Sequence, residues 1–172
     1  KKLLCGGCLG LGTNPVKTRF MVGDKCVFRH DDDSIDDLDF EILRWEVIKA
    51  IESQYYNVVL ISDYDKGFLN TKSICSIVGA CLENKIICVA DVKRSPEVYR
   101  GAIVKCNHYY SHKWKYVEDV CTAGPAPPLV GDWRLPLNLL PVRCVNHVGA
   151  GDCFAAHLAL GLAYGLSLEE SA

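Results

Sequence analysis

Apolar and polar positions along the chain follow two periods, which predict strands and helices in turn. Residues 58–62 and 86–90 are unbroken apolar runs, as expected of parallel strands that are buried on both faces. Between them, residues 71–83 place apolar side chains at helical spacing, and Asn84 follows as a C-cap. A strand, a helix and a strand at these distances predict a right-handed βαβ unit.

A hairpin and a helix are predicted before this unit. Residues 17–22 and 25–30 are strand-like, and Gly23 and Asp24 suit a two-residue turn with glycine at its first central position. An acidic stretch at residues 31–39 then leads into a helix, since acidic side chains favour helix N-termini. The apolar positions on one face of that helix are Ile42, Trp45, Ile48 and Ile51.

Two further strands are predicted after the βαβ unit. Residues 102–106 and 116–122 are the strand-like runs, and Pro125, Pro127 and Pro128 predict an irregular stretch behind them.

The last part of the chain predicts helices. Phe154, Leu158 and Leu162 recur every four residues, and Ser167 with Glu170 forms a capping box for one more helix. The whole order of elements predicts an α/β fold with a mainly parallel central sheet and helices on both faces.

Length, composition and charge fit an ordinary globular domain. The chain has 172 residues, of which 49% are hydrophobic and 23% are charged, which is enough for a core of its own. The formal net charge of −2 gives no reason to expect binding to nucleic acid or to an anionic membrane. No apolar run reaches the length that spans a bilayer.

The chain contains ten cysteines, most of them inside the predicted strands and helices. This placement favours free thiols in a reducing compartment over a disulfide framework, so a cytoplasmic location is expected. Cys5 and Cys8 form a lone Cys-x-x-Cys pair, and zinc would need two further ligands that no second motif supplies. No metal site is therefore predicted from the protein's own motifs.

A glycine turn before the last long helix is the clearest candidate for chemistry. The strand-like residues 142–145 lead into Gly149, Ala150, Gly151 and Asp152, and the helical pattern follows at once. The first amides of a helix lack intrahelical partners, and glycines let them approach a phosphate closely. Asp152 would lie beside that anion, either as a general base or as a cap of the helix. A dinucleotide-binding loop is disfavoured, because the third glycine of its fingerprint is missing.

Polar side chains stand near the ends of the predicted strands, where ligands bind in doubly wound sheets. These residues are Asp63, Lys66, Asp91, Lys93, Asn107, Thr122 and Asp152. Because the carboxyl ends of parallel strands meet at one edge, we expect the side chains to converge. Asp63 and Lys66 could contact substrate or form a salt bridge in the loop, and Lys93 could hold a phosphate or remain solvated.

The glycine turn and the small-residue helix after it resemble the signature of the PfkB/ribokinase family of carbohydrate kinases. Within that family the chain most resembles the bacterial D-glycero-D-manno-heptose 7-phosphate kinase domain, at residues 17–19, 28–31, 60–67, 90–93, 99–102 and 121–124. The resemblance implies a ribokinase-like three-layer α/β/α fold, with the N-terminal hairpin as the remnant of a lid. It also implies that Asp152 is the catalytic base and that the amides of Gly149, Ala150 and Gly151 form the anion hole.

The same resemblance implies a nucleotide side of the site, with ATP and Mg²⁺ as cofactors. The ATP-binding residues it implies are Asn107, His108, Tyr109, Tyr110, Thr122 and Gly124. Asp63, Lys66 and Lys93 would contact the sugar. The chain departs from the family at Tyr110, where the family has a glutamate that helps to organise magnesium.

Two functions remain open from the sequence. The first is an ATP-dependent sugar kinase that transfers the γ-phosphoryl group to a hydroxyl of a sugar or sugar phosphate, similar to heptose 7-phosphate; the intact residues 149–152 favour it. The second is a catalytically degenerate binding or regulatory module, or a fragment of a kinase, which the missing glutamate favours. Residues 1–172 would then be a single, partial kinase domain. The expected partners are a sugar phosphate and ATP, and a homodimer is compatible with the sequence. Binding to nucleic acid or to a membrane is not expected.

Overall fold

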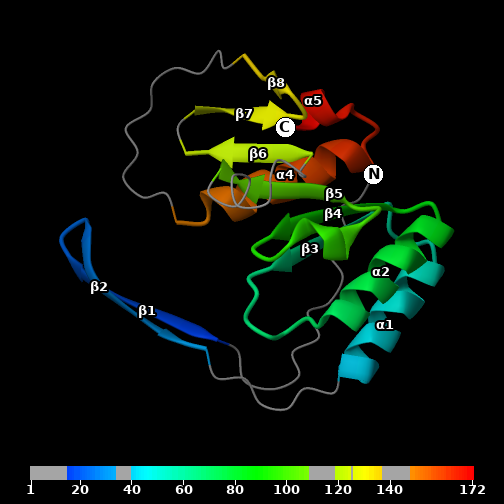
Figure 1. Ribbon diagram of the computed structural model, residues 1–172, viewed down its shortest axis with the longest axis horizontal. Helices are drawn as coiled ribbons and strands as arrows, with labels where there is room; N and C mark the ends of the chain where they lie inside the picture. Colours follow the sequence, from blue (N-terminus) through cyan, green and yellow to red (C-terminus); the bar gives the residue numbers. More distant parts are fainter. Residues whose placement is uncertain (1–14, 34–39, 109–118, 125, 137–147) are drawn as a thin grey trace.

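The structure is a computed structural model that describes residues 15–33, 40–108, 119–124, 126–136 and 148–172 (Figure 1). Its strands are β1 Val16–Val22, β2 Lys25–Asp32, β3 Val58–Asp63, β4 Ile87–Val92, β5 Ile103–Asn107, β6 Val120–Ala123, β7 Ala126–Val130 and β8 Trp133–Arg134. Its helices are α1 Phe40–Glu52, α2 Thr71–Glu83, the 3-10 helix η1 Pro96–Tyr99, α4 Ala150–Ala163 and α5 Leu168–Ser171.

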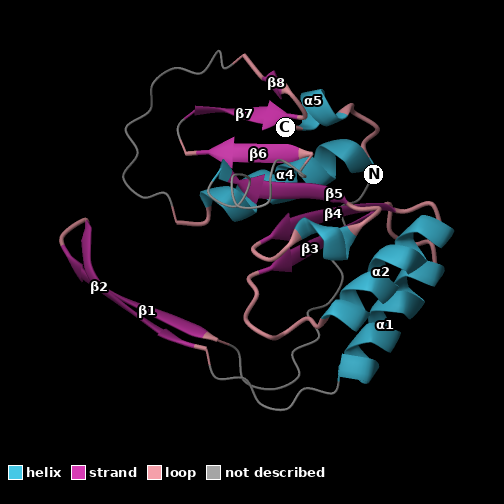
Figure 2. Ribbon diagram, viewed as in Figure 1, coloured by secondary structure: helices cyan, strands magenta, loops and turns pink. Residues whose placement is uncertain are grey.

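The main sheet has the strand order β3-β4-β5-β6-β7-β8 (Figure 2). β3 to β6 run parallel, and β7 and β8 complete the sheet as antiparallel strands. β3, α2 and β4 form the predicted βαβ unit, and Asn70 caps α2 by accepting a hydrogen bond from the Ser73 amide at 2.8 Å. The predicted α/β fold with a mainly parallel sheet is therefore confirmed.

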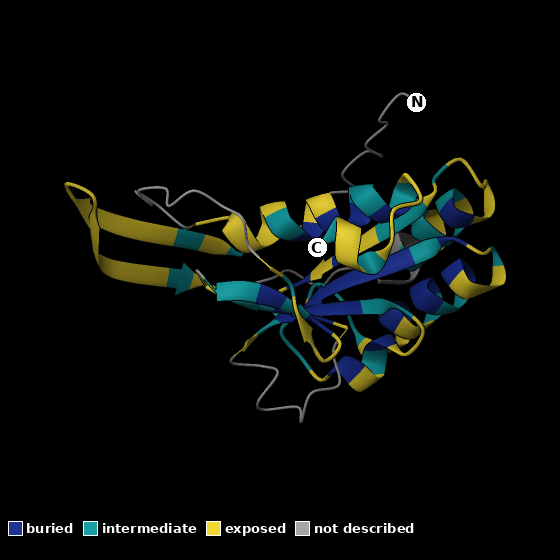
Figure 3. Ribbon diagram, turned by 90° about the horizontal axis from the view of Figure 1, so that it is seen from above, coloured by how far each residue is buried: buried dark blue, intermediate teal, exposed yellow. Residues whose placement is uncertain are grey.

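Helices cover both faces of this sheet and make three layers. On one face lie α1 and α2, whose Ile51 and Ile74 are at most 1% exposed. On the other face lies α4, whose Leu158 is fully buried against Val89 of β4 and Val120 of β6. Burying a side chain of this kind contributes about 1.5–3 kcal/mol. Figure 3 shows the buried strands lying between the two helical layers.

β1 and β2 form the predicted hairpin, which is a separate sheet (Figure 1). Gly23 has a φ of 57° at its turn, as the expected glycine position requires. Because successive side chains of a strand point to opposite faces, Lys17 and Arg19 share one face of the hairpin. Their cross-strand neighbours on that face are Asp31 and Arg29. One face of the hairpin is therefore charged.

The other face of the hairpin is aromatic. Phe20 and Phe28 are cross-strand neighbours with ring centroids 5.5 Å apart. Both side chains are more than half exposed, and the hairpin is mostly exposed along its length (Figure 3). Its apolar residues are thus not part of the core.

Pro125, Pro127 and Pro128 were expected to interrupt the chain and lead into an irregular stretch, but residues 126–130 form β7 and pair with β6. Proline has no amide hydrogen to donate to a neighbouring strand. Pro127 and Pro128 are therefore tolerated only where the sheet uses their carbonyl oxygens as hydrogen-bond acceptors. Arg134 Nη1 donates to the Pro127 carbonyl at 3.2 Å, and the Leu135 amide donates to that of Pro128 at 3.0 Å. A register irregularity in β6 accompanies the pairing.

Trp45 also departs from its prediction, because it is 56% exposed instead of buried on the apolar face of α1. Helix α1 packs mainly on α2, so only a narrow stripe of it is covered. The predictions for residues 116–118 and 142–145 and for the Cys5–Cys8 pair fall outside the described residues. The thiols of Cys26, Cys75, Cys81, Cys88 and Cys153 are free, as predicted. Within the described part of the chain, every helix is too short or too polar to cross a membrane.

Candidate active site

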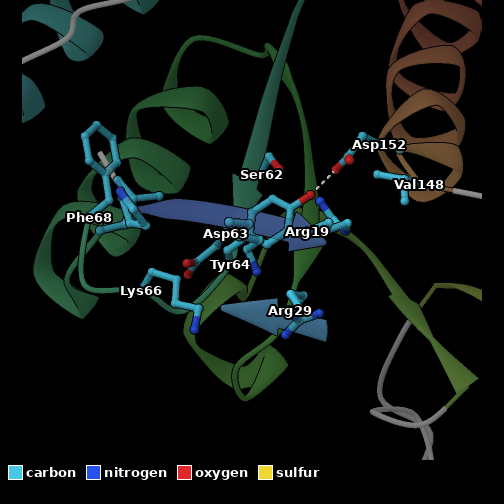
Figure 4. Close-up of a pocket in the computed structure, with 13 residues that line it drawn as sticks. Arg19, Arg29, Ser62, Asp63, Tyr64, Lys66, Phe68, Val148 and Asp152 are labelled. Carbon is cyan, nitrogen blue, oxygen red and sulfur yellow. Dashed lines mark hydrogen bonds between the residues drawn. The ribbon is translucent and has the colours of Figure 1, made fainter. Parts of the chain in front are cut away.

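A cavity of about 800 Å³ opens where the hairpin, the carboxyl end of β3 and the start of α4 meet (Figure 4). This volume lies in the range of small-molecule sites. The charged residues of its lining are Lys17, Arg19, Arg29, Lys66, Asp63 and Asp152. The rest of the lining is Pro15, Ser62, Tyr64, Phe68, Leu69, Val148 and Gly149.

Four cations of this lining come from three segments. Lys17 and Arg19 lie on β1, Arg29 on β2 and Lys66 in the loop after β3. Arg19 and Arg29 are direct cross-strand neighbours, and like charges in that arrangement destabilise a sheet. Arg29 is paired with Asp31 at 2.7 Å, whereas Arg19 makes no hydrogen bond or ion pair within the described residues. Such a guanidinium pair suits a phosphate.

Of the two alternatives for Asp63 and Lys66, the salt bridge between them is not formed. Lys66 instead pairs with Asp33, and this hydrogen bond raises the pKa of the Lys66 ammonium. Asp63 is 4% exposed. Arg94 Nε forms an ion pair with its Oδ2 at 2.7 Å, but this contact does not have the geometry of a hydrogen bond. The Tyr99 hydroxyl donates a hydrogen bond to the same oxygen. Asp63 thus borders the cavity while its carboxylate is engaged inside the fold.

Asp152 lies in the first turn of α4 and is exposed to the cavity. The N-cap of this helix is Gly149, with a φ of 82°, and no side chain makes a cap hydrogen bond. The alternative in which Asp152 caps the helix is therefore wrong. Instead, the Tyr64 hydroxyl donates to Asp152 Oδ1 at 2.5 Å (Figure 4), and Oδ2 has no hydrogen-bond donor among the described residues. A carboxylate held by one oxygen can accept a proton on the other.

Tyr64 was not identified from the sequence, yet it connects several parts of the site. Its ring centroid lies 5.5 Å from the ammonium of Lys17 and 5.7 Å from that of Lys93, within the range of cation–π contacts. Burial, together with the hydrogen bond to Asp152, raises the pKa of Tyr64 to about 12. The phenol is therefore protonated at neutral pH and remains a donor.

Lys105 of β5 is a second residue that the sequence reading missed. It is 2% exposed, with Nζ 3.1 Å from Asp91 Oδ2 and 3.3 Å from the Gly151 carbonyl oxygen. The only signal in the sequence was a lysine within a strand that is otherwise apolar. Lys93 pairs with the other oxygen of Asp91 at 3.2 Å and is not part of the cavity lining.

The residues predicted to bind nucleotide lie at the ends of β5 and β6. Asn107 and Thr122 are cross-strand neighbours there, and His108 follows β5 as an exposed residue. Gly124 has a φ of 60° in the turn toward β7. Residues 109–110, predicted for the same side, lie outside the described residues. The neighbouring end of β5 contacts the glycine turn through Lys105, so this edge adjoins the candidate anion hole.

No family model matches this chain. The bifunctional protein HldE of Aliarcobacter butzleri (strain RM4018) is 30% identical over 182 aligned residues, which cover 90% of this chain and 38% of that protein. Two structures of phosphofructokinase-2 from Escherichia coli, a mutant and the tetrameric inhibited form, match with TM-scores of 0.62 and 0.60. Their sequence identities are 19% and 18%, and the match covers 84% of this chain and 56% and 57% of theirs.

The fold defines the class: this is a ribokinase-like α/β protein with an N-terminal hairpin. With the sequence similarity to HldE added, the chain is similar to carbohydrate kinases of the PfkB/ribokinase type. It spans 38% of the length of that relative.

Proposed function

We propose that this protein is an ATP-dependent sugar kinase whose acceptor already carries a phosphate group. The observation that supports this most directly is the meeting of four cations with the exposed carboxylate of Asp152 in one cavity. Cations around a cavity favour an anionic ligand, and the carboxylate can act on a hydroxyl of that ligand. A sugar similar to heptose 7-phosphate combines both groups, and the sequence resemblance favours the same class.

Asp152 supplies the base in this proposal. The acceptor hydroxyl gives its proton to Oδ2 while its oxygen attacks the γ-phosphorus of ATP, and ADP leaves. Tyr64 holds Oδ1 by its hydrogen bond, so the carboxylate keeps one orientation. The amides of Gly149, Ala150 and Gly151, at the positive end of the α4 dipole, stabilise the charge on the transferred phosphoryl group.

In this proposal, Mg²⁺ would be held mainly by the nucleotide. Among them, no group of three or more His, Cys, Asp or Glu side chains could hold a metal ion. Mg²⁺ usually binds through substrate phosphates, waters and one or two carboxylates, so a protein cage is not required. The ion would neutralise phosphate charge. Asn107 and Thr122 would lie on the nucleotide side of the site.

The cations would select a phosphorylated acceptor. Arg19 and Arg29 can each form charge-assisted hydrogen bonds to a phosphate, worth about 1.5–3 kcal/mol apiece. If desolvation cancels half of that gain, about 1.5–3 kcal/mol remains, which corresponds to roughly 10- to 10²-fold in kcat/KM. The same sugar without its phosphate should therefore be a much poorer acceptor.

This selectivity gives the experiment. ADP release with ATP and Mg²⁺ should be measured with a panel of sugar phosphates and with each matching free sugar. We expect turnover with at least one heptose or hexose phosphate, and a kcat/KM at least about tenfold above that of the free sugar. Equal rates with both forms would contradict the acceptor assignment.

A second candidate function is a kinase-fold binding or regulatory module. Tyr110, which stands where the family has a magnesium-organising glutamate, favours it. In that case calorimetry would detect binding of ATP and of a sugar phosphate, but no ADP would form with any acceptor.

We also infer a homodimer and a cytoplasmic location, where ATP is available. The apolar side chains of the hairpin, Phe20 and Phe28 among them, are exposed in the single chain, and a second copy would cover them. Light scattering should give twice the chain mass of 19.0 kDa. A monomer at every concentration would contradict the dimer.

A further inference from the structure

A buried ion pair lies beneath the glycine turn, outside the cavity lining. Lys105 and Asp91 face each other in register on neighbouring strands, and they are 2% and 3% exposed. Their charged atoms, Lys105 Nζ and Asp91 Oδ2, are 3.1 Å apart. The pair therefore joins β4 to β5 at the point where α4 begins above them.

Stability alone gives a poor reason for this pair. Removing two charges from water is costly, and well-packed apolar residues of the same volume are often as stable or more so. The neighbours of the pair, Val104, Cys106 and Val120, are apolar and buried, so apolar side chains would suit the positions of Lys105 and Asp91 as well. What an apolar pair could not provide is a positive charge at this position.

The charge lies directly against the first turn of α4. Lys105 Nζ is 3.3 Å from the Gly151 carbonyl oxygen, and a Cβ on Gly151 would lie only 3.4 Å from the same nitrogen. The turn is also bent at Gly149, whose φ of 82° favours glycine. The backbone of the turn thus contacts the Lys105 ammonium at Gly151, and Asp152 is the residue that follows Gly151.

We propose that Lys105, held by Asp91, is a positioning residue that fixes the glycine turn and places a positive charge under its anion site. The ligand is a phosphate-like anion, which the helix amides hold from one side and the ammonium attracts from below. The inference rests on the proposed function in taking this anion to be the transferred phosphoryl group. Because the acceptor phosphate would be held by Arg19 and Arg29 in the cavity, Lys105 should influence the rate and leave acceptor binding unchanged.

Variants separate this role from packing. Lys105→Met keeps the length of the side chain but leaves the buried Asp91 with only Lys93 as an ion-pair partner, so it should lower stability. The double variant Lys105→Met with Asp91→Asn removes both charges and should recover much of that loss. Lys49→Met, on the exposed surface of α1, is the control for losing a lysine.

Two readouts are needed. The first is the binding of inorganic phosphate, followed by amide shifts of Gly149, Ala150 and Gly151 in ¹H–¹⁵N NMR spectra. We expect the double variant to bind phosphate at least about tenfold more weakly than the wild type, while Lys49→Met binds as the wild type does. The second readout is turnover, in which kcat should fall at least about tenfold with little change in the KM of the sugar phosphate.

The outcomes distinguish this inference from the proposed function. If a stably folded double variant binds phosphate and turns over as the wild type does, the positioning role is overturned and the kinase assignment stands. A second outcome is that the wild type binds phosphate at the turn and the double variant binds it more weakly, while the wild type never transfers phosphate to a sugar. In that case the role of the charge stands and the kinase assignment fails. If phosphate does not shift these amides in the wild type, the anion site itself is refuted.

Discussion

Replacing Asp63 by asparagine tests whether this residue belongs to the fold or to the substrate site. Asp63 is 4% exposed, and Arg94 Nε lies 2.7 Å from its Oδ2. The Asp65 amide donates to its Oδ1 at 2.8 Å, and the Tyr99 hydroxyl donates to Oδ2. Burial, and then the hydrogen bond to Asp63, raises the pKa of Tyr99, so this hydroxyl remains a donor at neutral pH.

The magnitude follows from which contacts survive. Removing one partner of a buried ion pair costs about 3–5 kcal/mol. Asparagine keeps an oxygen for the Asp65 amide, and Arg94 keeps its hydrogen bond to the Leu69 carbonyl at 3.0 Å and its ion pair with Asp65 at 3.1 Å. We therefore expect Asp63→Asn to lower the free energy of unfolding by about 2–3 kcal/mol.

Urea unfolding followed by circular dichroism measures this change. With an m-value of about 1–3 kcal/mol/M, the midpoint should fall by roughly 1–2 M. Asp65→Asn is the matched control, because its side chain is 53% exposed and its pair with Arg94 should contribute about 1 kcal/mol or less. If Asp63→Asn has the same urea midpoint as the wild type but a lower affinity for the sugar phosphate, Asp63 is a substrate contact and the argument is refuted.

Three further predictions concern the cavity. Arg19→Gln should raise the KM of a phosphorylated acceptor about tenfold or more, because one charge-assisted contact is lost, while Arg134→Gln on β8 should leave it unchanged in the same assay. Tyr64 has a pKa of about 12 in the folded chain and about 10 in the unfolded chain. Its contribution to stability is therefore complete below pH 10 and is lost as the pH rises to about 12. Between about pH 9 and 12, the urea midpoint should fall less steeply with pH in Tyr64→Phe than in the wild type. Gly149→Ala should destabilise by about 1–2 kcal/mol in urea, since its φ is 82° and the added methyl meets no atom within 4 Å; an unchanged midpoint would show that the turn is not strained.

The parts of the fold that were predicted correctly are those whose signal is local. The βαβ unit follows from two apolar runs around a helix with period 3.6, and the hairpin follows from Gly23 and Asp24 between two strand-like runs. The strand β7 was missed because Pro127 and Pro128 argue against a strand in isolation. Only their place beside β6 and β8 makes their missing amides harmless.

The candidate site divides in the same way. Gly149 to Asp152 was found because a glycine turn before a helix has a physical meaning that can be read along the chain. The Arg19–Arg29 pair was not found, because it exists only through the cross-strand register. Tyr64 and Lys105 were missed because their roles depend on contacts with α4, which lies far away in the sequence.

The central claim is that Asp152 is the base of a sugar phosphate kinase, and turnover of Asp152→Asn tests it most directly. Asparagine keeps the size of the side chain but cannot take the proton, so ADP release with ATP and a sugar phosphate should fall by about 10² to 10⁴. ATP affinity should hold or improve, because a negative charge beside the phosphates is removed. Asp132→Asn, at the exposed turn between β7 and β8, should keep full turnover. Equal turnover in Asp152→Asn and the wild type, or none in either while both ligands bind, would contradict the claim.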